Sequence, residues 1–462
     1  MSIDRRDFLF LAGAAGAGRS HASAPPPCVG NDFPQFPPGA FRFDSVPDFQ
    51  LGQFHPNPPK RPLWSKLSDP EKGSLAKELK RAYTRMMNRP SANRKSYLFQ
   101  AWTHAWYCGG NDPFFGDIHN TWAFLLWHRA FLYLHERLIQ AELGDPDFRL
   151  PVWDWETDPN VPWVYNSLPW VKHIHCDCPR KQNYICPVTQ GQIAAWFGGS
   201  CFDSVVGGLT YPGTAFGSLH QCVHKQLGGC MGDFVSAALD PVFYAHHANV
   251  DRFLDAWQTQ NPGSYTKWPT SCFYFYDRGR PVRVHVQDLH RTLSLGYEYD
   301  LPCIPKSEAV QAAIVDGLVR LDDCATQRLS KLLRLNLGSG LAGPATERVP
   351  SLAVQFRASV PTEHGRYYIF GMQGTQDRSS WSVAMDPCAG LIGMHRSPAE
   401  AVIAADLDLD GRLLLDALRQ GIQLVYGQSS KPGDPVCNGA PIANPKPFTP
   451  ESFEIRVATV GS

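Results

Sequence analysis

The stretch that decides the fold is DPVFYAHHANVD, residues 240–251. It places two adjacent histidines, His246 and His247, on what should be a buried helix, with a carboxylate one turn later. Upstream, His220 and His224 are spaced four residues apart, which puts both imidazoles on one face of a helix. Imidazole clusters without nearby thiolate or carboxylate ligands suit copper or zinc, because neutral ring nitrogens are borderline donors. The stretch therefore predicts a metal centre.

A second stretch, HNTWAFLLWHR at residues 119–129, supplies two further histidines, His119 and His128. Nine residues at about 100° each put these two side chains on opposite faces, so one helix cannot present both of them. Helices with inward-facing ligands are how bundle cores hold paired metals. Apolar periodicity predicts such a bundle from helices at 68–88, 95–106, 124–142, 220–227 and 240–258.

These stretches resemble the two copper signatures of tyrosinases, catechol oxidases and haemocyanins. Residues 119–136 fit the first signature without a mismatch, and residues 240–251 fit the second. Three shorter segments are similar to plant-type polyphenol oxidases: QAWTHAWYC at 100–108, LPVWDW at 150–155 and LGYEYD at 295–300. The resemblance covers about residues 60–300. It implies three ligands for each of two copper ions: His104, His119 and His128 for the first, and His220, His224 and His247 for the second.

The resemblance also implies a chemistry. A type-3 copper oxidase converts o-diphenols to o-quinones while dioxygen is reduced to water, and monophenols are a further substrate class that stays open. The expected partners are therefore a small phenolic molecule and dioxygen. Two alternatives use the same copper pair: an oxidase of o-aminophenols in biosynthesis, and a haemocyanin-like oxygen carrier.

Other residues are candidates for the surroundings of the copper pair. His246 points about 100° away from His247, so we expect it to line the substrate cavity or to pack behind the ligands. Asn249, with Asp251 and Arg252, lies where it would orient the His247 side of the centre.

Two positions bear on the choice of substrate. Phe216 stands where many relatives that hydroxylate monophenols carry a glutamate, and Gln221 stands where those relatives often carry an asparagine. Without an obvious base, deprotonating a monophenol is harder, so these residues favour diphenol oxidation. Lys225 follows His224 and predicts a preference for acidic phenols through charge pairing.

Thirteen cysteines are many for a cytosolic enzyme and predict an oxidising compartment in which most of them pair. In plant-type polyphenol oxidases a cysteine near the first ligand is joined by a thioether to the second histidine. Cys108 matches that cysteine and His119 that histidine, which would leave twelve cysteines for six disulfides. The run HIHCDC at 173–178 reads either as a small metal site or, with Cys186 and Cys201 nearby, as a disulfide-stapled loop, which is favoured.

The chain divides into four predicted parts. A mainly α catalytic domain at 25–302 holds the dicopper centre, and a linker region at 303–349 is helical or irregular and contains the run GSGLAGP. Residues 350–462 are β-rich and predict a β-sandwich of about 110 residues. This part resembles, loosely, the shielding domain that covers the active site in plant and fungal relatives. Its strands are expected at 352–360, 366–371, 381–385, 422–426 and 453–460.

Residues 1–24 resemble a twin-arginine signal peptide. Arg5 and Arg6 precede an apolar run that is too short to span a bilayer, and an Ala-x-Ala cleavage site ends at Ala24. The alternative is a disordered tail. Export by this route predicts a bacterial protein that is periplasmic or secreted, with no membrane contact in its mature form. Lys plus Arg equal Asp plus Glu at 43 each, so no net charge draws the chain to nucleic acid.

Overall fold

The computed structural model describes most of the chain up to residue 333 and separate segments after it. The described residues are 46–52, 57–108, 117–166, 179–209, 212–233, 235–316, 318–333, 352–359, 367–374, 383–384, 400–407, 411–429 and 446–459. The predicted signal peptide, the HIHCDC run and the GSGLAGP run lie outside these residues. No helix within the described ranges is long and apolar enough to cross a membrane.

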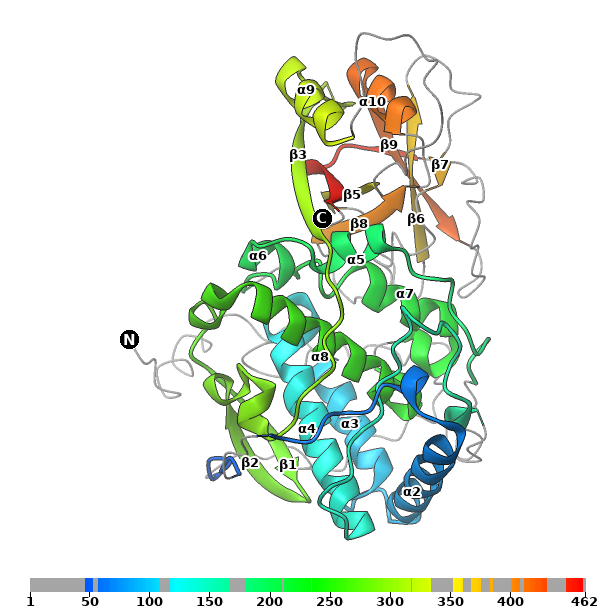
Figure 1. Cartoon of the computed structure of the whole chain (residues 1–462), viewed down its shortest axis with the longest axis vertical. Helices are drawn as coiled ribbons and strands as arrows, with labels where there is room; N and C mark the ends of the chain where they lie inside the picture. The colour runs from blue at the N-terminus through cyan, green and yellow to red at the C-terminus, as the bar shows by residue number, and fades with distance from the viewer. Residues whose placement is uncertain are drawn as a thin grey trace, which may run out of the picture.

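Five helices make up the bundle that the sequence predicts (Figure 1). The helix α4 lies at its centre and packs against α2 and α8. Each predicted span agrees with the structure to within a few residues. The helices are α2 (Asp69–Met87), α3 (Tyr97–Cys108), α4 (Ala123–Leu143), α7 (Ser218–Leu227) and α8 (Val242–Gln260).

Local chemistry explains where these helices begin and end. Ser68 and Glu71 form a capping box at the start of α2, so two backbone N–H groups that lack helical partners are satisfied. The carboxylate of Asp240 accepts a hydrogen bond from the backbone N–H of Val242 (3.1 Å) and thereby caps α8. Gly144 ends α4 in the left-handed conformation (φ 69°), which glycine adopts without steric cost.

The bundle core is rich in large aromatic side chains. Trp102, Trp127, Trp153, Trp155 and Trp257 are all fully buried. Burial of one large apolar side chain stabilises the fold by about 1.5–3 kcal/mol, so this core holds the surrounding helices in fixed positions. Shorter elements complete the helical part: η2 (Trp64–Lys66), η3 (Ile118–Asn120), η4 (Trp163–Tyr165), α5 (Gln190–Phe197), α6 (Phe202–Val205), η6 (Gly229–Gly232), η7 (Ala237–Leu239), η8 (Pro262–Thr266), β1 (Cys272–Asp277), β2 (Arg280–His285), η9 (Val286–Leu289) and η10 (Thr292–Leu295).

The C-terminal part is an antiparallel sheet of nine described strands with two helices. The strand order is β7-β6-β9-β4-β3-β11-β5-β8, and β10 pairs with β9. The strands are one continuous sheet by hydrogen bonding, so the predicted sandwich of two sheets is not confirmed. The elements are β3 (Lys306–Val315), β4 (Leu318–Arg320), α9 (Asp323–Leu332), β5 (Leu352–Ser359), β6 (Tyr367–Gly374), β7 (Val383–Ala384), β8 (Glu400–Leu407), α10 (Gly411–Gln420), β9 (Ile422–Ser429), β10 (Lys446–Phe448) and β11 (Ser452–Thr459).

The sequence prediction for this part needs one correction. Residues 303–349 are predicted to be a linker, but β3 and β4 belong to the sheet, and β3 pairs with β11 from Lys306 to Ala312. A lone strand carries little local signal, because its partner here lies more than a hundred residues further along the chain. The five strands expected beyond residue 350 are confirmed as β5, β6, β7, β9 and β11.

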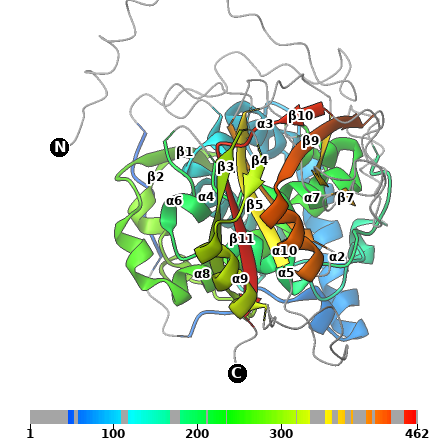
Figure 2. The ribbon, with the colours of Figure 1, turned by 90° about the horizontal axis from the view of Figure 1, so that it is seen from above.

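The sheet packs on one side of the helical part. The short helix α5 contacts β5, β8 and β11, and it also contacts α7 and α8. The strand β8 contacts α7 directly. Figure 1 shows the sheet above α5 and α7, and Figure 2 looks down on the same arrangement, with α5 close to β5 and β11. The sheet thus lies next to the helix that carries His220 and His224.

Candidate metal centre

Three histidines from three different elements form the first cluster. His104 lies on α3, His119 on η3 and His128 on α4, and each offers a ring nitrogen within 4.8 Å of the others. The Nε2 atoms of His104 and His128 are 3.4 Å apart. His119 reaches the cluster from the turn before α4, as the opposite-face argument from the sequence predicts.

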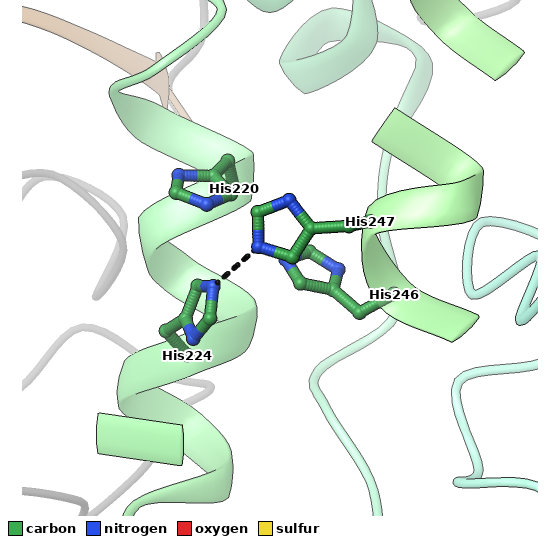
Figure 3. A group of neighbouring side chains, drawn as sticks. All are labelled: His220, His224, His246 and His247. Atoms are coloured by element: carbon green, nitrogen blue, oxygen red, sulfur yellow. Dashed lines mark hydrogen bonds between the residues drawn. The ribbon is translucent and has the colours of Figure 1, made fainter. Parts of the chain in front are cut away.

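Four histidines from two helices form the second cluster (Figure 3). His220 and His224 project from α7, and His246 and His247 project from α8 toward them. The Nε2 atoms of His224 and His247 are 3.3 Å apart. All four side chains are buried.

The two clusters lie next to each other. The rings of His128 in the first cluster and His247 in the second are stacked, with centroids 4.3 Å apart and planes 8° from parallel. Two metal ions bound by these clusters would therefore be neighbours in one buried site.

Hydrogen bonds fix which ring nitrogen faces inward at three of the clustered histidines. The Nδ1 atoms of His128, His220 and His224 each lie 2.8 Å from a backbone carbonyl, those of Phe124, Phe216 and Met231 respectively. A carbonyl only accepts, so Nδ1 carries the proton and Nε2 presents a lone pair. At His224 that lone pair is directed toward the Nε2 of His247.

The charge state of the rings agrees with this arrangement. Burial lowers the pKa of His104, His128, His220 and His247 well below the usual value, and that of His224 to about 3. The rings are therefore neutral at neutral pH, and lone pairs converge without protons between them. A bound cation relieves this repulsion, and an all-imidazole donor set suits copper, so the residues fit a copper pair.

His246 differs from the other members of its cluster. The indole N–H of Trp155 donates a hydrogen bond to Nδ1 of His246 (3.2 Å). Because burial lowers the pKa of His246, its ring is neutral and the single proton lies on Nε2. His246 then has no lone pair for a metal, whereas His247 has its Nε2 directed at His224. The structure places His246 inside the second cluster, packed over His220.

Asp117 is a residue that the sequence reading missed. Its Oδ1 accepts hydrogen bonds from the backbone N–H of His119 (2.9 Å) and from the His119 Nδ1 (3.1 Å). A carboxylate bonded to Nδ1 leaves Nε2 as the donor atom for metal and fixes the ring orientation. In the sequence, Asp117 is only an acidic residue two positions before a histidine, and this pattern is too common to identify a functional residue.

Asn249 and Arg252 lie on α8, the helix that carries His247. Asn249 donates to the carboxylate of Glu156 (2.7 Å), and Arg252 bonds Glu156 (2.5 Å) and the backbone carbonyl of Asp300 (2.6 Å). These contacts hold α8 against the segments around Glu156 and Asp300. Glu156 was also missed, although it directly follows the LPVWDW segment.

Asp251 connects α8 to α4 and to the segment before the C-terminal sheet. Its carboxylate accepts from Arg129 Nε (2.6 Å) and from the hydroxyls of Tyr297 (2.7 Å) and Tyr299 (2.8 Å). Arg61 lies 3.6 Å away, with its guanidinium over the Tyr297 ring. Asp251, the acidic residue of the second signature, therefore positions helices and is not a member of either histidine cluster.

The two positions linked to substrate choice lie close to the clusters. The ring of Phe216 packs between His119 (5.5 Å between centroids) and His220 (5.6 Å). An apolar ring here supplies no base. Gln221 and Lys225 are both buried on α7, adjacent in sequence to His220 and His224.

Cys108 lies at the first cluster, as predicted. Its Sγ is 3.2 Å from Nε2 of His104 and 3.7 Å from Nε2 of His119, and it forms no disulfide in the described part of the chain. Cys186, Cys222 and Cys230 are disulfide-bonded.

The prediction of six disulfides is wrong. Cys201 and Cys303 are exposed and form no disulfide with any residue that the structure describes. Cys201 lies directly before α6, and the 173–178 loop that it is predicted to staple lies outside the described residues. An even number of cysteines does not show that they lie close together, and a disulfide needs two Cα atoms within about 7 Å of each other.

Known proteins with a similar sequence include polyphenol oxidases and a catechol oxidase. Residues 94–199 and 192–260 match the common central domain of tyrosinase, and residues 266–309 match the polyphenol oxidase middle domain. A chloroplastic polyphenol oxidase from Spinacia oleracea is 28% identical over 325 residues, covering 57% of this chain and 50% of the relative. Chloroplastic catechol oxidase B from Solanum tuberosum is 28% identical over 367 residues, covering 64% and 61%.

The fold agrees over a longer range. A solved structure of a latent aurone synthase, described as a polyphenol oxidase, has a TM-score of 0.57 at 20% identity and covers 90% of this chain and 93% of that one. This likeness concerns the fold alone. The chain spans about half the length of the first curated relatives that it matches.

Proposed function

We propose that this chain is a member of the tyrosinase and polyphenol oxidase family and a type-3 copper oxidase that converts o-diphenols to o-quinones with dioxygen reduced to water. The observation that carries the proposal is the pair of adjacent histidine clusters whose lone pairs converge. The proposed ligands are His104, His119 and His128 for one copper and His220, His224 and His247 for the other. When bound, the copper pair supplies two-electron exchange with dioxygen.

The chain's own residues contribute geometry and a dry environment. Backbone carbonyls hold the rings of His128, His220 and His224, and Asp117 holds the ring of His119, so the donor atoms are fixed before metal binds. The wall of buried aromatic side chains around both clusters excludes water. Phe216 favours substrates that need no added base, and this supports diphenols over monophenols.

The test is a metal and substrate assay on the full chain. Copper-loaded protein should contain two copper ions per chain and consume dioxygen with 4-methylcatechol. An o-aminophenol should react more slowly than the catechol, and a higher rate would favour the biosynthetic alternative. Reversible oxygen binding without turnover of catechol would favour a carrier. One zinc per chain as the only bound metal would overturn the proposal.

A second prediction concerns Cys108. We expect a thioether between its Sγ and a ring carbon of His119, in which two hydrogens are lost to an oxidant such as dioxygen at the copper-loaded site. Sγ lies 3.7 Å from Nε2 of His119 and 3.2 Å from Nε2 of His104, so both rings are within reach, and the choice of His119 rests on the resemblance to plant-type polyphenol oxidases. Copper-loaded protein would be reduced, alkylated, digested and examined by mass spectrometry. A crosslinked species two hydrogens lighter than the sum of its peptides is the expected result.

The same sample contains its own control. The exposed Cys201 and Cys303 should be recovered fully alkylated, which shows that reduction and labelling were complete. Recovery of alkylated Cys108 alongside them would rule the thioether out.

A third prediction is that the intact chain is latent. The C-terminal sheet rests on α5 and α7, and α7 carries two of the proposed ligands, so we infer that residues 306–459 shield the site. The strands that contact α5 include β5, β8 and β11, which all follow residue 350. Protease cutting between Arg334 and Arg348, followed by separation of the fragments, should raise the rate with catechols. An unchanged rate after complete cutting and separation would show that the sheet is not a lid.

We also propose that residues 1–24 direct export and are removed, so that the mature protein is periplasmic or secreted. Bacterial origin is part of the same proposal. Sequencing the N-terminus of the protein recovered from its producing cells tests the cleavage after Ala24.

A further inference from the structure

A cavity lies at the far end of α8 from His246 and His247. Its volume is about 420 Å³, it is open to solvent, and it is lined by residues of the last turn of α8, of η8 and η10, and of the segment 298–301. This volume is in the range of small-molecule sites. None of the clustered histidines lines it, so the cavity is separate from the metal centre.

Two opposite charges line this cavity without neutralising each other. The guanidinium of Arg291 lies over the ring of Tyr265, 4.6 Å from its centroid. Glu298 lines the same cavity. Neither side chain forms an ion pair with any residue that the structure describes. Lys60 also lines the cavity, but its ammonium is paired with Asp300 at 2.7 Å. The guanidinium of Arg291 and the carboxylate of Glu298 are therefore both available to a ligand in the cavity.

Asp255 adds a second carboxylate to the same lining. It accepts a hydrogen bond from the hydroxyl of Thr292 (3.2 Å), and Arg129 is 4.0 Å away on the buried side. Burial raises the pKa of Asp255, and the negative charge of Glu298 adds to that rise. A positive group between the two carboxylates would stabilise both of them.

The rest of the lining is apolar or aromatic. Pro262, Leu293 and Leu301 line the cavity together with Tyr265 and Tyr299. Leu301 is among the few large apolar side chains that the described structure leaves exposed. These groups offer contact to a hydrophobic side chain on a ligand that also carries charges.

We propose that this cavity is a binding site for a zwitterionic α-amino acid with an aromatic or similar apolar side chain. The ligand's carboxylate pairs with Arg291, its ammonium lies between Glu298 and Asp255, and its side chain contacts Leu293 and Pro262. A simple anion is disfavoured by the two carboxylates, and a simple cation is disfavoured by Arg291. Only a ligand with both charges can pair with Arg291 and with the two carboxylates at the same time.

Calorimetric titration of the full chain with L-phenylalanine tests the site, because this ligand has no phenol to be oxidised. A ligand of this size should bind once per chain with a dissociation constant on the order of millimolar. Phenylpropionate lacks the ammonium and phenethylamine lacks the carboxylate. Each should bind about tenfold more weakly, since one charge-assisted contact is lost. Equal binding of phenylpropionate and L-phenylalanine would overturn the zwitterion assignment.

Matched variants locate the binding. Arg291→Gln and Glu298→Gln should each weaken L-phenylalanine binding by about tenfold. Arg280→Gln removes an exposed arginine on β2 that does not line the cavity and should bind like the parent chain. The melting temperature of each variant shows that the fold is kept. Binding that survives Arg291→Gln unchanged, or that is lost in His247→Ala, would place the amino acid at the metal centre and overturn the proposal.

Discussion

His247→Ala is expected to lose oxidase activity by more than a hundredfold and to bind one copper fewer per chain, with its fold retained. Changes to residues that only orient metal ligands already cost about ten- to a hundredfold, and loss of a ligand should cost more. The reason lies in the second cluster, where the Nε2 of His247 faces that of His224 at 3.3 Å. Copper content by atomic absorption and dioxygen uptake with 4-methylcatechol measure the two effects.

His246→Ala is the matched control, because the two histidines are adjacent, buried and on the same helix. It should keep both copper ions, since the hydrogen bond from Trp155 to Nδ1 leaves its ring without a lone pair for metal. Its activity should fall far less than that of His247→Ala. If His246→Ala loses copper and His247→Ala keeps it, the assignment of the ligand is reversed.

Asp251→Ala is expected to lower the free energy of unfolding by about 3–5 kcal/mol. The substitution leaves the buried guanidinium of Arg129 without the carboxylate that it bonds at 2.6 Å. It also removes the acceptor of the Tyr297 and Tyr299 hydroxyls. Uncompensated buried charge is the costly part, because no water reaches it. Chemical denaturation of the parent chain and the variant measures the difference.

Asp300→Asn serves as the comparison. Its carboxylate pairs with Lys60 at 2.7 Å, but both side chains are about half exposed, so its removal should cost less than about 1 kcal/mol. The folded fraction of Asp251→Ala should still bind two copper ions, because Asp251 is not among the metal-binding groups. A loss of copper with unchanged stability would instead make Asp251 part of the metal centre.

The sequence by itself determined the helices and the histidines that face a metal. Helical periodicity and the spacing of His220 and His224 depend only on neighbours within a few residues, so they can be read directly. The same local argument separated His119 from the helix of His128, and η3 is where the structure places it. The third member of each cluster came from resemblance: His104 from the plant-type segment at 100–108, and His247 from the second copper signature.

Only the tertiary structure decided the partners of the buried polar groups. Trp155 meets His246, Glu156 meets Asn249 and Tyr297 meets Asp251, each across many residues of chain. Likewise β3 is recognisable as a strand only beside β11, and Cys303 as exposed only once its surroundings are folded. These contacts depend on how elements distant in sequence pack together, and packing is a property of the whole chain rather than of any local pattern.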